Sequence, residues 1–167
     1  MDKSLLFLNI DGVLNTQKSQ DSWKDDSWEF VKFDKTASLN FFELMSEIQC
    51  DIVLIDRTWN KDFSLKEIVK IFFRYTFHKE GTEYSKLDFS EKGKKKGPEI
   101  LKYLDSHPEY KTYLVMDHDD SEIKQFIPEE NFLHVKAGWF RGLTQININE
   151  AIEKLSLQKS KLETINV

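Results

Sequence analysis

Three short apolar runs in this chain each stop at an aspartate, and this repeated pattern limits the fold more than any other feature. The runs and their aspartates are residues 5–10 with Asp11, residues 51–55 with Asp56, and residues 113–116 with Asp117. A weaker fourth run covers residues 131–135. Nearly continuous apolar runs of this length are typical of strands that are buried on both faces. The sequence therefore predicts a sheet that is covered by helices on both sides.

Apolar residues recur at helical spacing in the segments between and after these runs. The segments are residues 33–48, 61–77, 98–104 and 149–155. Pro98 suits an early position of the third segment, and Asn147 or Asn149 is the predicted N-cap of the fourth. The alternation of strands and helices indicates an α/β protein with a doubly wound parallel sheet.

The length of 167 residues predicts a single domain over residues 1–167, because domains commonly contain about 100–200 residues. Residues 16–32 fit neither the strand nor the helix pattern, and we expect them to form a loop or flap over the carboxyl ends of the strands. Residues 78–97 are predicted to form a second irregular, polar connection. The polar C-terminal tail, residues 156–167, is expected to continue the last helix.

Composition narrows the class of protein further. Hydrophobic residues make up 40% of the chain, which excludes a fully disordered protein. The formal net charge of −5 argues against a general nucleic-acid coat. The single cysteine, Cys50, excludes an intrachain disulfide and a cysteine-rich zinc site, and it suits a reducing, cytoplasmic compartment. The N-terminal apolar run is interrupted by Asn9 and Asp11, so it predicts neither a signal peptide nor a membrane span.

The aspartates that end the runs are expected to meet at one edge of the sheet, because ligands of open α/β sheets bind outside the carboxyl ends of the strands. Asp119 and Asp120 add two more carboxylates after Asp117. Converging carboxylates repel one another unless a cation lies among them, and oxygen-only ligands favour Mg²⁺ over zinc. The alternative is that each aspartate simply ends a strand and caps a turn or helix. For three aspartates in register, the metal-site interpretation is favoured.

Four segments resemble the motifs of the haloacid dehalogenase-like (HAD) phosphohydrolases. LLFLNIDGVLN at residues 5–15 is similar to the first motif, in which an apolar strand precedes Asp-x-Asp-Gly-[Val/Thr]-Leu. IVLIDRTW at residues 52–59 is similar to the second motif, Lys96 takes the place of the third-motif lysine, and YLVMDHDD at residues 113–120 is similar to the fourth motif. The resemblance points to a small-capped branch that includes HAD domains associated with RNA-repair proteins. It implies a HAD-like, Rossmannoid core with a minimal cap.

The resemblance also implies a role for each matched position. The leading aspartate of the first motif attacks phosphorus and forms an aspartyl-phosphate, and here that nucleophile position is Asn9. The aspartate two residues later donates a proton and then activates water, and this catalytic position is intact as Asp11. Lys96 is expected to hold the phosphoryl oxygens. The implied cofactor is Mg²⁺. Its implied ligands are Asn9, Asp11, Asp117 and Asp119.

The chain departs from the family pattern at two of these places. A neutral amide at Asn9 is a poor nucleophile, which blocks the aspartyl-phosphate route. Asp56 stands where a serine or threonine is expected to bind substrate, so a negative charge would face the phosphate. Thr58 supplies the hydroxyl if the register differs by two residues. Arg57 either pairs with Asp11 or Asp56, or binds a phosphate as a bidentate fork.

Asn9 permits three interpretations. Natural divergence into a pseudoenzyme is favoured, because a deliberate Asp→Asn change would leave Asp56 without an explanation. The second interpretation is such a deliberate change in an otherwise active enzyme. The third is that another carboxylate, such as Asp56, acts as the nucleophile. The leading hypothesis is a Mg²⁺-dependent phosphatase-type domain that is impaired or inactive at its nucleophile.

Two alternatives belong to other classes of protein. One is a non-catalytic binding module that holds a phosphorylated ligand or a protein partner. The other is a receiver domain, which Asp-Gly-Val-Leu after the first strand does not suit. The expected ligands are a phosphorylated small molecule or a nucleic-acid end, and no membrane is involved. The lysine-rich run at residues 92–96 is interpreted chiefly as a solvated loop, and which of Lys94, Lys95 and Lys96 faces the site stays open.

Overall fold

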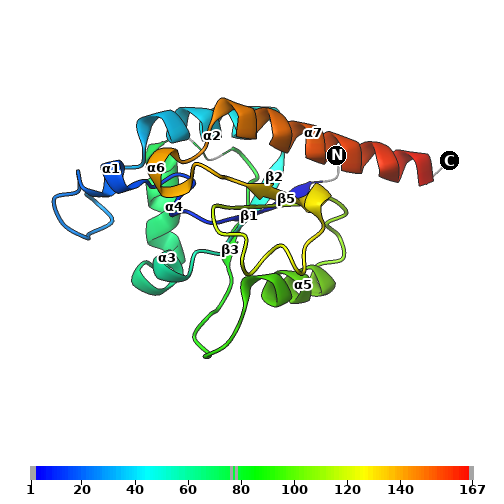
Figure 1. Cartoon of the computed structure of the whole chain (residues 1–167), viewed down its shortest axis with the longest axis horizontal. Helices are drawn as coiled ribbons and strands as arrows, with labels where there is room; N and C mark the ends of the chain where they lie inside the picture. The colour runs from blue at the N-terminus through cyan, green and yellow to red at the C-terminus, as the bar shows by residue number, and fades with distance from the viewer. Residues whose placement is uncertain (1–2, 76, 78, 166–167) are drawn as a thin grey trace.

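A computed structural model shows one five-stranded parallel sheet between two layers of helices (Figure 1). The structure describes residues 3–75, 77 and 79–165. The strand order across the sheet is β3-β2-β1-β4-β5. The strands are β1 (Ser4–Leu8), β2 (Cys50–Leu54), β3 (Tyr84–Lys86), β4 (Tyr113–Asp117) and β5 (Phe132–His134). The predicted α/β class and parallel sheet are confirmed, and the four predicted strands correspond to β1, β2, β4 and β5.

The strand register brings the candidate site together. β1 lies at the centre of the sheet, where Leu8 is paired with Leu54 of β2 and with Met116 of β4. All three strands run in the same direction, so the residues that follow these three positions leave the sheet at one edge. The central strands are buried on both faces, because side chains alternate between two apolar layers.

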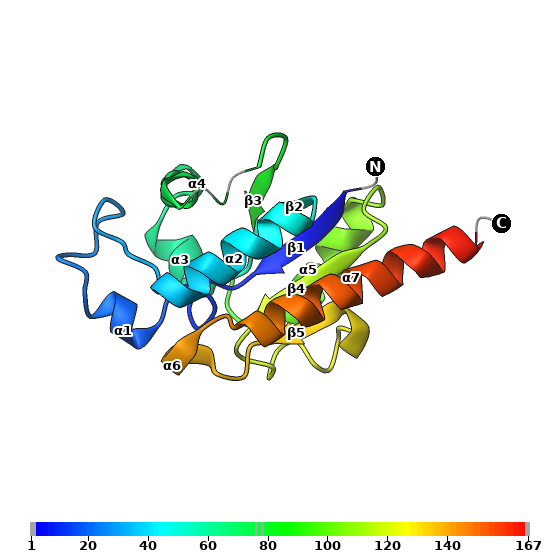
Figure 2. The same ribbon diagram turned by 90° about the horizontal axis from the view of Figure 1, so that it is seen from above.

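The two helical layers enclose two separate hydrophobic clusters. The helices are α1 (Gln17–Gln20), α2 (Lys35–Glu47), α3 (Arg57–Asp62), α4 (Leu65–Arg74), α5 (Lys96–Ser106), α6 (Gly138–Arg141) and α7 (Gln145–Ile165), with a short 3₁₀ helix at Glu129–Asn131. Seen from above, α2 and α7 lie side by side across one face of the sheet (Figure 2). The larger cluster packs beneath α2, α4 and α7. The smaller one packs between the sheet and α5 on the opposite face.

The predicted helix over residues 61–77 is wrong in its extent. The segment instead contains the end of α3 and, after a break at Phe63, the separate helix α4. Ser64 restarts the chain as a helix: its hydroxyl accepts a hydrogen bond from the Glu67 N–H, and the Glu67 carboxylate accepts one from the Ser64 N–H. This capping box satisfies N–H groups at the start of α4 that would otherwise lack partners.

The predicted irregular connection over residues 78–97 is also wrong in part. Its first residue lies outside the described residues. The rest of the segment contains the edge strand β3 and the first two residues of α5. β3 has only three residues, Tyr-Ser-Lys, and none of them is fully buried. A short strand at the sheet edge carries no apolar run, so its sequence does not separate it from a loop.

The last helix begins earlier than predicted. α7 begins at Gln145, so neither Asn147 nor Asn149 is its N-cap. Asn147 instead accepts a hydrogen bond from the Thr144 N–H at 3.0 Å through Oδ1. The polar tail continues the helix as far as Ile165, as expected. In the part of the chain that the structure describes, no helix combines the length and the apolar character needed to cross a membrane.

Candidate active site at the carboxyl ends of the strands

Asn9 follows β1 directly and lies at the centre of the candidate site. Its side chain is buried, with 2% of the residue exposed. The amide oxygen Oδ1 accepts a hydrogen bond from Lys96 Nζ at 3.0 Å, and Nδ2 donates to the main-chain carbonyl of Asp11 at 2.7 Å. The ammonium can only donate, so the contact with Lys96 sets which way the amide faces. Asn9 is therefore held on both sides as a neutral hydrogen-bonding group.

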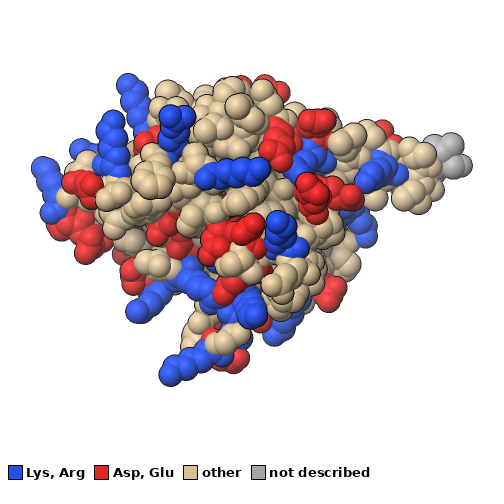
Figure 3. Space-filling model, in the orientation of Figure 1, with Lys and Arg blue, Asp and Glu red and all other residues tan. Residues whose placement is uncertain are grey.

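Lys96 is the lysine of the 92–96 run that faces the site. Its Nζ also contacts Asp117 Oδ2 at 2.7 Å, and Asp117 is fully buried at the end of β4. Lys96 is the first residue of α5, which begins two residues earlier than the sequence pattern indicated. Lys94 pairs with Glu91 at 3.5 Å, and Lys95 is exposed. Lys92, Lys94 and Lys95 belong to the loop between β3 and α5. Figure 3 shows Lys and Arg side chains on the lower part of the molecule, where this loop protrudes.

Asp56 spans two elements with its two carboxylate oxygens. Oδ1 accepts from the Trp59 N–H at 3.1 Å and so caps α3. Oδ2 accepts from the main-chain N–H groups of Ile10 at 3.2 Å and Asp11 at 2.8 Å. Burial and the nearby Asp11 carboxylate raise the pKa of Asp56 to about 6, and the hydrogen bonds that it accepts act in the opposite direction. The three N–H groups that donate to Asp56 favour its ionised form.

Asp11 is oriented by two side chains. Its Oδ1 accepts from the indole Nε1 of Trp59 at 2.8 Å and from Nδ2 of Asn15 at 2.8 Å. Neither Trp59 nor Asn15 is among the site residues that the sequence predicted. Trp59 packs against Trp23, with ring centroids 5.8 Å apart, and its indole N–H also donates to Asp11. A buried indole N–H usually finds a hydrogen-bond partner, and this was the signal in the sequence for a polar contact of Trp59.

The predicted flap, residues 16–32, contributes to a cleft of about 460 Å³ beside Asp11. Three acidic side chains line it: Asp11, Asp26 and Asp62. Thr58 is exposed on the cleft wall. Lys and Arg are absent from the side chains that line this cleft. The cleft mouth is thus an acidic and aromatic surface.

Arg57 pairs with Glu122 rather than with Asp11 or Asp56. It donates to Glu122 Oε2 at 2.6 Å and to the main-chain oxygen of Lys94 at 2.5 Å. Its guanidinium also lies 4.4 Å from the ring centroid of Phe89. Arg57 therefore links the start of α3 to the loop before α5 and to the segment after β4.

Of the residues after β4, His118 lies at the site and Asp119 is exposed to solvent. The main-chain N–H of Asp119 donates to Asp117 Oδ1 at 3.0 Å, while the exposed Asp119 carboxylate accepts from the Ser121 N–H, which lowers the Asp119 pKa. His118 Nδ1 lies 3.5 Å from Asp117 Oδ1 and 3.4 Å from Asn9 Nδ2. Its hydrogen bond with Asp117 raises the His118 pKa. Asp117 thus lies between a lysine and a histidine.

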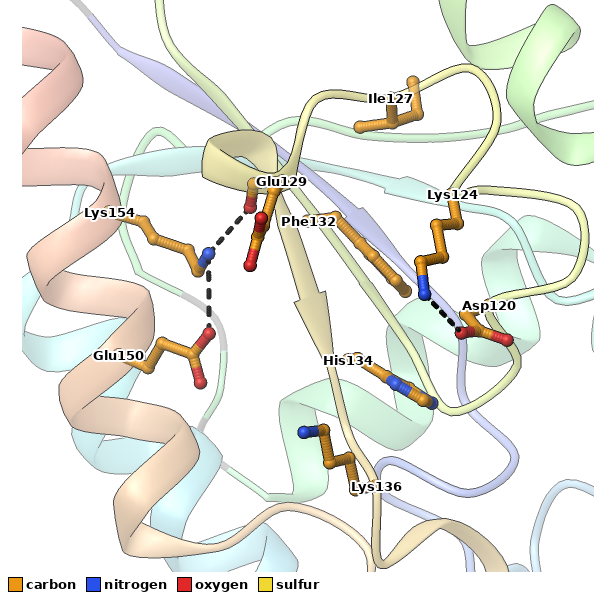
Figure 4. Close-up of a pocket in the computed structure, with 9 residues that line it drawn as sticks. All are labelled: Asp120, Lys124, Ile127, Glu129, Phe132, His134, Lys136, Glu150 and Lys154. Carbon is orange, nitrogen blue, oxygen red and sulfur yellow. Dashed lines mark hydrogen bonds and ion pairs between the residues drawn. The ribbon is translucent and has the colours of Figure 1, made fainter.

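A second hollow of about 500 Å³ lies between β5, α7 and the segment after β4 (Figure 4). Its charged side chains are mostly paired within the hollow. Lys154 lies 3.4 Å from Glu150 and donates to the Glu129 carbonyl at 2.7 Å, while Lys124 lies 4.0 Å from Asp120. None of the strand-end residues Asn9, Asp11, Asp56 and Asp117 lines it. The strand-end cleft and this hollow are separate features.

The fold and this edge of the sheet define an α/β domain of the HAD-like class. The family described as "HAD domain in Swiss Army Knife RNA repair proteins" matches residues 5–148, and the chain belongs to that family. No curated protein and no solved structure gives a significant match. The family supports a phosphohydrolase-type domain, as the motif resemblance implied.

Proposed function

We propose that this domain keeps the architecture of a phosphohydrolase site but does not form an aspartyl-phosphate. The observation that carries this proposal is the position of Asn9. Its neutral amide follows the central strand, where Lys96 and the Asp11 carbonyl hold it by two hydrogen bonds. A carboxylate nucleophile attacks through a negatively charged oxygen, and an amide lacks that charge. The remaining groups then bind and orient without a group that accepts the phosphoryl.

The rest of the site supports a phosphohydrolase ancestry. Trp59 and Asn15 hold the Asp11 carboxylate through one of its oxygens and leave the other free to donate or accept a proton. Lys96 is within hydrogen-bond reach of both the Asn9 oxygen and the Asp117 carboxylate. A lysine in this place would orient a phosphoryl oxygen and offset its charge.

We propose that this site binds Mg²⁺ weakly. The oxygen donors that would hold it are Asn9 Oδ1, the Asp11 main-chain carbonyl and the Asp117 carboxylate, a set of the kind that Mg²⁺ takes. When bound, Mg²⁺ would offset the charge of the phosphoryl group. Within residues 3–75, 77 and 79–165, no group of three or more His, Cys, Asp or Glu side chains is arranged as a metal cluster. Asn9 adds a neutral oxygen, and Lys96 already contacts the oxygens of Asn9 and Asp117, so we propose that Mg²⁺ binds weakly. We also propose Asp119 as a further ligand of Mg²⁺.

We further propose a phosphorylated ligand and a cytoplasmic location. The family name associates such domains with RNA repair, which supports a phosphorylated nucleic-acid end as ligand beside a phosphorylated small molecule. The acidic cleft favours a second candidate, a non-catalytic module that binds a protein partner. The single cysteine supports a cytoplasmic location.

The test measures phosphate release from a panel of phosphomonoesters, with and without Mg²⁺. It compares the chain with Asn9→Asp, Asp56→Ser and the double variant. We expect the chain itself to release no phosphate above background. Turnover by the unmodified chain would refute the proposal and point to another nucleophile, beginning with Asp56. Turnover by a variant that carries Asn9→Asp would show that Asn9 blocks the reaction in a site whose other groups are competent.

A further inference from the structure

At the carboxyl ends of the strands, the carboxylate of Asp56 contacts the loop after β1, which lies 46 residues away in the sequence. Its Oδ2 is shared by two consecutive main-chain N–H groups, those of Ile10 at 3.2 Å and Asp11 at 2.8 Å. Asp56 is 3% exposed, so these contacts are shielded from water. Asp56 thus supplies the anion that two converging N–H groups in this place bind.

Adjacent main-chain N–H groups that point at one oxygen do not distinguish a carboxylate from a phosphoryl group. Both offer a negatively charged oxygen acceptor, and hydrogen bonds to such an acceptor are shorter and stronger than neutral ones. A phosphoryl oxygen that approached Ile10 and Asp11 would have to displace Asp56 Oδ2. It would also meet the charge of Asp56 in a shielded place, where like charges repel strongly.

We propose that Asp56 is an internal anion that fills the oxyanion position at the end of β1 and excludes phosphate from it. Asp56 is then the residue that determines which anions this site accepts. This role of Asp56 rests on the proposed function for one point only, which is that the ligand carries a phosphoryl oxyanion. It predicts that restoring a carboxylate at Asn9 is not sufficient for phosphate to bind.

A purely structural role for Asp56 makes a different prediction. Capping α3 requires only Oδ1, which accepts from the Trp59 N–H. Serine and threonine also cap helices well, but their single hydroxyl is too short to serve α3 and the two N–H groups together. Asp56→Ser therefore keeps the cap and vacates the oxyanion position. If capping were the whole role, this variant would gain no affinity for phosphate.

The experiment titrates inorganic phosphate and tungstate into the chain, Asp56→Ser and Asp62→Ser. Asp62 ends the same helix, and its exposed carboxylate gives a charge-matched control. Calorimetry measures affinity, and the amide resonances of Ile10 and Asp11 report the site. We expect Asp56→Ser to bind both anions at least about tenfold more tightly than the chain, a difference of about 1.4 kcal/mol. The two amide resonances should shift only in that variant, and Asp62→Ser should behave like the unmodified chain.

Two results would overturn the inference. One is phosphate binding by the unmodified chain with shifts at the Ile10 and Asp11 amides. The other is a folded Asp56→Ser that gains no affinity. If Asp56→Ser does not fold, Asp56→Thr replaces it, and the titration of the unmodified chain tests the inference without any variant. Equilibrium binding is independent of turnover, so failure here is distinguishable from failure of the proposed function, which depends on phosphate release.

Discussion

The ammonium of Lys96 joins the Asn9 amide to the Asp117 carboxylate, at 3.0 Å and 2.7 Å. The contact unites the ends of two strands with the first residue of α5. Asp117 is fully buried, and 11% of the Lys96 side chain is exposed. Removal of one partner from such a pair leaves a buried charge without compensation, and this costs more than the pair itself contributes.

Lys96→Met should therefore destabilise the protein strongly. We expect a loss of about 3–5 kcal/mol in the free energy of unfolding, measured by urea denaturation. Lys95→Met is the matched control, because Lys95 precedes Lys96 and is exposed, and it should change stability by less than about 0.5 kcal/mol. Equal losses in the two variants would show that the Lys96–Asp117 contact does not stabilise the fold.

Asp56→Asn should be more harmful than its small change in shape suggests. One of the two carboxylate oxygens becomes an NH₂ group, which faces N–H donors from Ile10 and Asp11 or from Trp59. Buried donors without an acceptor cost about 1–3 kcal/mol. Urea denaturation should show a loss in that range, whereas Asp62→Asn at the exposed end of α3 should resemble the unmodified chain. A stability unchanged by Asp56→Asn would contradict the hydrogen bonds described for Oδ1 and Oδ2.

Gly12→Ala should affect both backbone and site. Gly12 has φ 75°, and a Cβ there would lie 2.4 Å from Cγ of His118. Gly81 provides a control with φ 80° and open space around its Cβ position. Left-handed backbone costs a non-glycine residue roughly 1–2 kcal/mol, so both variants should lose about that much. Only Gly12→Ala should lose more and shift the NMR resonances of His118. Similar losses, with His118 unmoved, would rule out the steric contact.

Cys50 should resist alkylation in the folded protein. Its side chain is buried, and burial raises the pKa of the thiol to about 12. Iodoacetamide at pH 9 should label it only as the protein unfolds, as followed by mass spectrometry with a denatured control. Rapid labelling of the folded protein would show that Cys50 is accessible.

The same pKa shift predicts a dependence of stability on pH. The folded state holds the thiol proton more tightly than the unfolded state, whose cysteine pKa is about 8.5. The contribution of Cys50 to stability is therefore present below about pH 8.5 and is lost as the pH rises towards about 12. Cys50→Ala should reduce this slope in urea denaturation series, and an unchanged slope would contradict the shift.

Local patterns in the sequence were sufficient for much of the fold. Apolar runs identified β1, β2, β4 and β5, because strands buried on both faces must be continuously apolar. They did not identify β3, whose three residues at the sheet edge bury too little apolar surface to leave a pattern. The break between α3 and α4 was missed for a related reason: apolar spacing continues across Phe63, while the capping box at Ser64 decides where a new helix begins.

The candidate site could also be predicted from the sequence only in part. The sequence by itself determined the identities and order of Asn9, Asp56, Lys96 and Asp117, and the direction of a parallel sheet predicts that they meet at one edge. Only the tertiary structure decided what each side chain does there. Lys96 binds Asn9 and Asp117, and Asp56 turns one oxygen to its own helix and the other to the loop after β1. Such pairings depend on distances between segments far apart in the chain, and no local pattern of residues encodes those distances.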